Sequence, residues 1–281
     1  MFGYASNLVV PCLALVALTC TTATRASIEL RFIGVDPGAG SSAVPLRFNG
    51  SSVTAIVGQM SWDAKNDSGT PALIDGSDSV PDSIMSFCIE LGQYVSGSWN
   101  IYEKSPVANA VDPGISGKPG HKLGSARTTA LDLLADHFWD EATGPSLINA
   151  VAFQFAVWEI VHEFACLPPN YDLLNPPLSP KLNVSQSRGS FYVNTNPGSG
   201  AIRDAIDLAN NWLNQLATLT ADDNLSLIAL TNSGKQDQII QYKTPVGPPT
   251  QAVPEPFSLA VWGVLLGIGV MSNRRTAGVA C

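Results

Sequence analysis

Two residues of this chain have side chains that can react with each other. Cys88 lies in the segment 86–91, with the sequence SFCIEL, and Gln154 lies in the segment 152–159, with the sequence AFQFAVWE. A cysteine thiolate that attacks a glutamine carboxamide expels ammonia and leaves an internal thioester, which is an electrophile stored inside a fold. The pair therefore indicates a protein that could bond covalently to a nucleophile.

The surroundings of Gln154 predict that it is buried. It is the only polar side chain between positions 150 and 158, and the apolar residues point in every direction around the predicted helix. An unsatisfied buried amide costs about 1–3 kcal/mol, so Gln154 needs hydrogen-bond partners or a covalent link. The strand around Cys88 is apolar as well. If that strand lies against the helix, the two side chains meet.

Two further residues of the helix are candidates for supporting roles. A buried thiol becomes nucleophilic only with a base or a positive field nearby, and His162 lies two turns beyond Gln154. Trp158 is a candidate shield against hydrolysis of the bond. The simpler interpretations are a solvated or hydrogen-bonded histidine at the helix end and an ordinary core tryptophan.

The two segments resemble the thioester domain of bacterial surface adhesins, where an aromatic-Cys-aliphatic-acidic strand motif is joined to a Gln-x-Ala-aliphatic-Trp helix motif. Here these motifs read FCIE at 87–90 and QFAVW at 154–158, in the expected order. The resemblance covers roughly residues 80–165. It implies that an amine, typically a lysine on a target, opens the thioester and leaves an isopeptide bond on Gln154. Such a protein is a single-use covalent binder and not a turnover enzyme.

Cysteine usage leaves a second interpretation open. Of the five cysteines, only Cys88 and Cys166 lie in the predicted mature chain, and two cysteines in an exported protein normally indicate a disulfide. Cys166 lies about 18 Å from Gln154 along an unbroken helix, so one position of Cys88 does not easily serve both. The alternatives are a thioester adhesin, a non-reactive envelope or matrix protein with a Cys88–Cys166 disulfide, and free thiols.

The N-terminal residues predict export. Residues 8–18 form an apolar run, and residues 19–24 after it are small and polar. This is the plan of a secretory signal peptide over residues 1–26.

The C-terminal residues 253–281 resemble the PEP-CTERM sorting signal of Gram-negative bacteria. Its parts are Pro254, Glu255 and Pro256, an apolar stretch over 257–271, and Arg274 with Arg275. The stretch is shorter than the about 20 residues of a spanning helix, and the arginines would stay on the cytoplasmic side. The resemblance implies cleavage by exosortase-type machinery and a place at the cell surface, in the envelope or in the extracellular matrix. A plain membrane anchor is the alternative.

Composition bears on partners and cofactors. The net charge is −8 with 15 Lys plus Arg, so we expect no nucleic-acid partner. The three histidines show no ligand spacing and the acids of residues 63–78 match no calcium loop. We therefore expect no metal and no cofactor.

The pattern of apolar residues predicts one α+β domain over residues 27–243, followed by a proline-rich spacer at 244–256. In it, a β-sheet carrying the Cys88 strand packs on helices carrying Gln154. Strands are predicted at 28–33, 53–57, 84–91, 94–102, 225–230 and 238–242. Helices are predicted at 125–139, with Ser125 as N-cap, at 146–164 and at 200–219. Residues 63–81, 108–120 and 168–180 are predicted to be loops.

Overall fold

The structure is a computed structural model that describes residues 27–36, 43–48, 50–66, 83–112, 121–163, 182–185, 189–194, 200–221 and 225–243. The predicted signal peptide, spacer and sorting signal lie outside these ranges, as do Cys166 and the predicted loop at 168–180. Within the described ranges, no helix has the length and apolar character needed to cross a bilayer.

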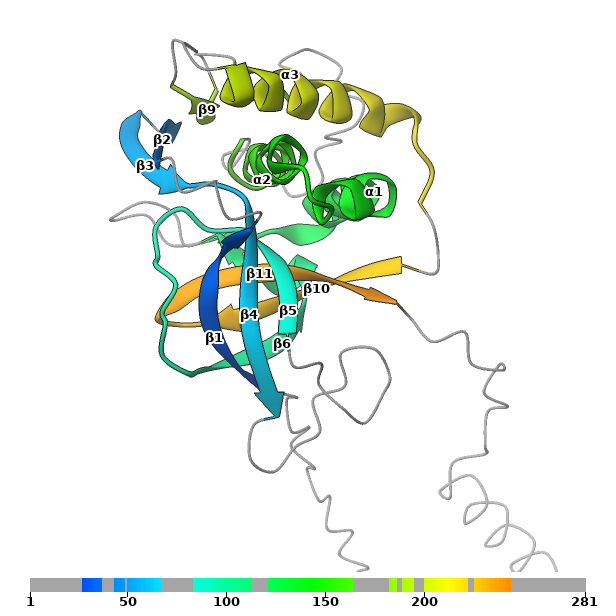
Figure 1. The fold of residues 1–281 in the computed structure, drawn as a ribbon. Coiled ribbons are helices and arrows are strands. Elements are labelled where there is room, and N and C mark those ends of the chain that lie inside the picture. The colour runs from blue at the N-terminus through cyan, green and yellow to red at the C-terminus, as the bar shows by residue number, and fades with distance from the viewer. Residues whose placement is uncertain are drawn as a thin grey trace, which may run out of the picture.

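Six antiparallel strands close into a barrel (Figure 1). Around the barrel they follow the order β1 (Ser27–Asp36), β4 (Gln59–Asn66), β5 (Ser83–Cys88), β11 (Lys235–Lys243), β10 (Leu225–Asn232) and β6 (Asn100–Pro106). The ring of Trp62 on β4 lies 5.8 Å from that of Tyr102 on β6, although β1 separates the two strands. These rings therefore meet inside the barrel and fill it.

Among the described residues there are also two smaller sheets and two short 3-10 helices. One sheet has the order β3 (Ser51–Ile56), β2 (Ala43–Phe48) and β9 (Phe191–Val193), and the other pairs β7 (Val111–Asp112) with β8 (His121–Lys122). The 3-10 helices are η1 (Val107–Asn109) and η2 (Leu216–Thr218).

Three α-helices lie together beside the barrel: α1 (Gly124–Ala142), α2 (Leu147–His162) and α3 (Gly200–Gln215). In Figure 1, α2 lies between α3 and the barrel, and it contacts both α1 and β5. Ser146 caps α2, because its Oγ accepts a hydrogen bond from Asn149 N at 3.3 Å. Every residue of α2 from Ala150 onward is buried, which confirms the burial predicted from its apolar circumference.

The mixed α+β class is confirmed, but the strands form a closed barrel where a sheet was predicted. Three local predictions are wrong. Helix α1 begins before Ser125, without a side-chain cap, the strand expected at 94–102 begins only at Asn100, and β4 continues through the start of the predicted loop at 63–81. Residues 63–66 were interpreted as a loop because acidic and small residues on the outer face of a strand resemble a loop when few apolar residues face inward.

Candidate functional site

The Gln154 carboxamide lies against the main chain of Cys88. Gln154 Oε1 accepts a hydrogen bond from Cys88 N at 2.9 Å, and Gln154 Nε2 donates to Cys88 O at 2.7 Å. Both residues are fully buried. The amide that needed partners therefore has two, and both belong to the cysteine that the sequence paired with it.

Strand β5 ends at a position that makes this contact available. The register Met60↔Ser86 between β4 and β5 would place Gly58 opposite Cys88, but β4 begins at Gln59. Ile89 N donates to Asp237 O on the β11 side, so the N–H and C=O of Cys88 face the side that β4 has left. The Gln154 amide thus takes the place of a neighbouring strand.

Aromatic packing fixes helix α2 against β5. The Phe87 ring lies 4.5 Å from that of Phe153 on α2 and 5.3 Å from that of Trp139 on α1. Phe87 and Phe153 are each the neighbour in sequence of a site residue, Cys88 and Gln154. Because packed cores adjust little, these rings hold the amide and the strand end in register.

The thiol of Cys88 makes a hydrogen bond to the chain that follows it. Its Sγ donates to Glu90 O at 2.6 Å. Burial raises the pKa of the Cys88 thiol well above its usual value, and negative charge on Glu90 and Asp237 adds to the rise. The indole N–H of Trp158 lies near the thiol and acts against this rise, yet it makes no hydrogen bond of standard geometry with the described residues.

Further polar groups lie on the barrel strands next to Cys88. Trp62 Nε1 donates to Ser86 Oγ at 2.7 Å, and Ser86 Oγ donates to Gln238 Oε1 at 3.0 Å. The Tyr102 hydroxyl is buried without a hydrogen-bond partner among the described residues. Burial raises the pKa of Tyr102, and negative charge on Asp237, Glu90 and Cys88 raises it further. The phenol therefore shares one electrostatic environment with the thiol.

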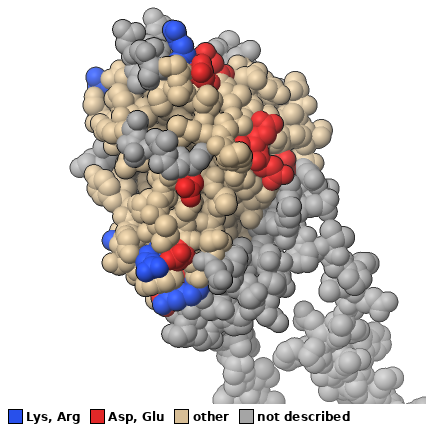
Figure 2. Space-filling view, viewed as in Figure 1, with Lys and Arg blue, Asp and Glu red and all other residues tan. Residues whose placement is uncertain are grey.

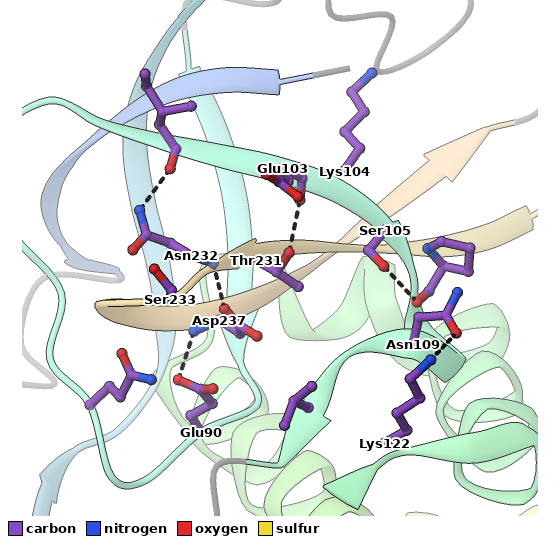
Figure 3. A pocket seen from close by; sticks show the side chains of 14 residues that line it. Glu90, Glu103, Lys104, Ser105, Asn109, Lys122, Thr231, Asn232, Ser233 and Asp237 are labelled. Carbon is purple, nitrogen blue, oxygen red and sulfur yellow. Dashed lines mark hydrogen bonds between the residues drawn. The ribbon is translucent and has the colours of Figure 1, made fainter. Parts of the chain in front are cut away.

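Glu90 and Asp237 are buried carboxylates that lie between this environment and a cleft. Glu90 Oε2 accepts a hydrogen bond from Asp237 N at 3.1 Å, and Asp237 Oδ1 accepts from Asn232 N at 2.7 Å. Burial raises the pKa of Asp237 to about 7. Both residues line a cleft of about 850 Å³ (Figure 3). The cleft thus reaches the residue whose carbonyl holds the thiol.

The two predicted supporting residues have different positions. Trp158 is buried, as predicted, one helical turn from Gln154 and near the thiol. His162 is also fully buried, but its ring packs at 4.4 Å from that of Phe48 and at 6.3 Å from that of Phe191. His162 follows Gln154 by eight residues, which is about 12 Å along the helix axis. The structure does not bring its ring to the cysteine.

Four residues of the site were not singled out from the sequence: Ser86, Tyr102, Asp237 and Gln238. The signal for the last two was the polar run 236–238, which directly precedes two isoleucines in a predicted strand. Ser86 and Tyr102 gave no such signal, because an isolated serine or tyrosine is common in strands.

The remaining sequence predictions concern the second cysteine, the sorting signal and a metal site. Cys166 and the sorting residues Pro254, Glu255, Pro256, Arg274 and Arg275 lie outside the described residues. In the part of the chain that the structure describes, no three His, Cys, Asp or Glu side chains gather as a metal site would require. On the face in Figure 2, charged side chains of the described residues are scattered among uncharged ones.

Comparison with family models, with curated proteins and with solved structures finds no match for this chain.

Proposed function

We propose that this protein is an exported surface protein that stores an internal thioester between Cys88 and Gln154 and uses it to attach covalently to amine groups on a target. The observation that carries the proposal is the position of the Gln154 carboxamide, which is hydrogen-bonded to both main-chain groups of Cys88 in a site without solvent. The motif resemblance points to the same two residues.

Bond formation needs an attack by Cys88 Sγ on the carboxamide carbon of Gln154. The S–H proton passes to the amide nitrogen, the C–N bond breaks and ammonia leaves. Negative charge develops on Oε1 during the attack, and Cys88 N already donates to that atom at 2.9 Å. A fixed donor at a developing oxyanion is a large stabilising contribution to acyl transfer. The thiol exchanges its contact with Glu90 O for the new bond.

The same geometry supports the later reaction with an amine. The amine nitrogen attacks the thioester carbon, the C–S bond breaks, and the proton lost by the amine goes to the departing sulfur. An amide then joins the target to Gln154, and Cys88 is again a thiol. Because the amide is stable, each molecule reacts once.

Exclusion of water decides whether such a bond survives. Trp158 is only 1% exposed, and Gln154 and Cys88 are fully buried. Hydrolysis competes with aminolysis wherever water reaches the carbon, so a closed aromatic surround favours a lasting thioester.

Intact-protein mass spectrometry of the unreduced full chain tests the proposal. A thioester lowers the mass by about 17 Da, whereas a Cys88–Cys166 disulfide removes only about two hydrogens. Methylamine should add to Gln154 and free the Cys88 thiol. Cys88→Ala and Gln154→Ala should each abolish the deficit, and Cys166→Ala should not change it. A spectrum at the full sequence mass, or a deficit that depends on Cys166, would favour the structural envelope protein.

The terminal segments support export and sorting as part of this proposal. The mature protein should begin near Ser27 and end near Pro256. N-terminal sequencing and C-terminal peptide mapping of protein from the native envelope check both ends. A surface-exposed form that still carries Arg274 and Arg275 would instead indicate a retained anchor.

A further inference from the structure

The cleft beside the reactive pair extends from a buried carboxylate end to an open end. Its walls come from the chain after β5, from β6 and from the turn between β10 and β11. Figure 3 shows Glu90 and Asp237 near each other, with Lys122 and Asn109 some way from them. The carboxylates are almost fully buried, with 3% of Glu90 and 5% of Asp237 exposed. Negative charge thus gathers at the deep end.

This deep end adjoins the thiol. The Glu90 carbonyl accepts the Cys88 S–H at 2.6 Å, and the negative charges of Glu90 and Asp237 both act on that thiol. Cys88 itself is fully buried. The residue whose carbonyl binds the thiol therefore lines the cleft.

A polar group without a partner lies inside the barrel. The Tyr102 hydroxyl is buried and makes no hydrogen bond with the described residues, and the Tyr102 ring packs 5.8 Å from that of Trp62. Burial raises the pKa of Tyr102, and negative charge on Asp237, Glu90 and Cys88 adds to the rise. Its chain neighbours Ile101 and Glu103 line the cleft.

We propose that this cleft is the route by which a primary amine reaches the Cys88–Gln154 bond, and that Asp237 accepts the proton from the attacking ammonium group. The inference rests on the proposed thioester function. Asp237 takes one proton from R–NH3⁺, the free amine attacks the thioester carbon, the C–S bond breaks, and the second proton lost by nitrogen goes to sulfur. Asp237 then releases its proton to solvent.

The charge state of Asp237 suits this role. Its pKa of about 7 leaves it largely ionised just above neutral pH and able to be protonated during the reaction. The ionisable groups around it are Glu90 after β5, Cys88 on β5 and Tyr102 on β6, and the cleft also contains Glu103, Lys104 and Lys122. A cationic amine matches the carboxylate end, whereas an anionic nucleophile does not.

The first test compares Asp237→Asn with the wild-type full chain. Asparagine keeps the Oδ1 acceptor for Asn232 N, so the turn should hold. Both proteins should show the ammonia deficit, and the variant should react with methylamine at least about tenfold more slowly at pH 8. The wild-type to variant rate ratio, which cancels the ionisation of methylamine, should fall toward one below about pH 6. Asp207→Asn, on the exposed face of α3, should match the wild type.

The second test obstructs the route. Ser233 is exposed in the β10–β11 turn and lines the cleft, so Ser233→Trp should slow biotin-cadaverine more than methylamine and leave the deficit intact. Asn211→Trp, on the exposed side of α3, serves as the control.

The outcomes separate this inference from the proposed function. No deficit in the wild type would overturn both. A deficit in the wild type that Asp237→Asn abolishes would assign Asp237 to bond formation and overturn its role in aminolysis. Equal methylamine rates in Asp237→Asn and wild type at every pH would also overturn that role. If Ser233→Trp reacted with methylamine and with biotin-cadaverine at the wild-type rates, the route would be overturned.

Discussion

Helix α2 contributes buried polar side chains to two regions, and they differ in how those side chains are satisfied. At its C-terminal end, Glu159 Oε1 accepts from Asn183 N at 2.7 Å and Glu163 Oε2 accepts from Phe191 N at 3.0 Å. These carboxylates bind the main chain of segments that pack on the helix. In the middle of the helix, Gln154 instead binds the main chain of a cysteine.

The buried polar groups near each region can also be compared. Around Cys88, the hydroxyl of Tyr102 and the indole N–H of Trp158 are buried without partners of standard geometry in the described structure. Near the end of α2, Glu163 Oε2 accepts from Phe191 N at 3.0 Å, while the second carboxylate oxygen of Glu159 has no hydrogen-bond partner in the described structure. Both regions therefore contain an unsatisfied buried group, and they differ in whether a reactive cysteine lies beside it.

The largest predicted difference comes from exchanging acid and amide between the two regions. Gln154→Glu should abolish both the ammonia deficit and methylamine labelling, because a carboxylate has no ammonia to lose. Glu159→Gln should retain both, because its Oε1 can still accept from Asn183 N. Intact-mass spectra of the two variants measure this directly. Loss of the deficit in Glu159→Gln would show that the regions are not independent.

Trp158 should matter to both stability and chemistry. Trp158→Ala should lower the free energy of unfolding by about 3–5 kcal/mol, as large-to-small changes in a packed core do. Trp158→Phe, which keeps much of the volume but lacks the N–H, should cost less and should shorten the lifetime of the thioester. Urea denaturation and time-resolved mass spectra separate the two effects. Trp99, which is 37% exposed, supplies the control variant Trp99→Ala, and equal costs for the two alanine variants would contradict the burial argument.

Glu163 should affect stability alone. Glu163→Ala leaves the N–H of Phe191 without its acceptor, and an unsatisfied buried group costs about 1–3 kcal/mol. Gly189→Ala should act on the same contact, because an added Cβ would stand 2.5 Å from Glu163 Oε2. Both variants should keep the ammonia deficit. A deficit that disappears in either would indicate that β9 supports the reactive pair.

The pH dependence of stability should differ between the regions. Burial raises the pKa of Asp237 to about 7 and that of Glu159 well above its usual value. A carboxyl whose folded pKa is raised binds its proton more tightly when folded, so its stabilising effect is lost as pH rises toward the folded pKa. Each group should contribute a slope of up to about 1.4 kcal/mol per pH unit.

Denaturation curves of two variants show how much of this pH dependence of stability each carboxyl contributes. Asp237→Asn should flatten the loss of stability between about pH 4 and 7. Glu159→Gln should flatten a loss that begins at similar pH, since burial, and after it the Glu163 charge, raise the pKa of Glu159. Unchanged slopes in both variants would mean that neither carboxyl is neutral in the folded protein at low pH.

Several elements could be predicted because their signal is local. The apolar circumference of residues 150–158 predicted a buried helix, and that helix is α2. The helix predicted at 125–139 is present within α1. Strand β4 was missed, although Met60, Trp62 and Ala64 alternate as its buried residues, because the acidic and small residues between and after them resembled a loop.

The chemistry of the candidate site was also local in part. The sequence by itself determined which residue types are present, their order and the burial expected for Gln154, because side-chain reactivity and helical periodicity depend on near neighbours. It left open whether Cys88 meets Gln154, and it gave no reason to place Tyr102 or Asp237 nearby.

Only the tertiary structure decided those relations. The contact depends on β4 beginning at Gln59, which frees the main chain of Cys88 for the amide, and on barrel closure, which brings β6 and β11 to the same interior. Both follow from strand pairing between residues far apart in the chain. Such pairing is set by the packing of the whole core, and no short segment of the sequence contains it.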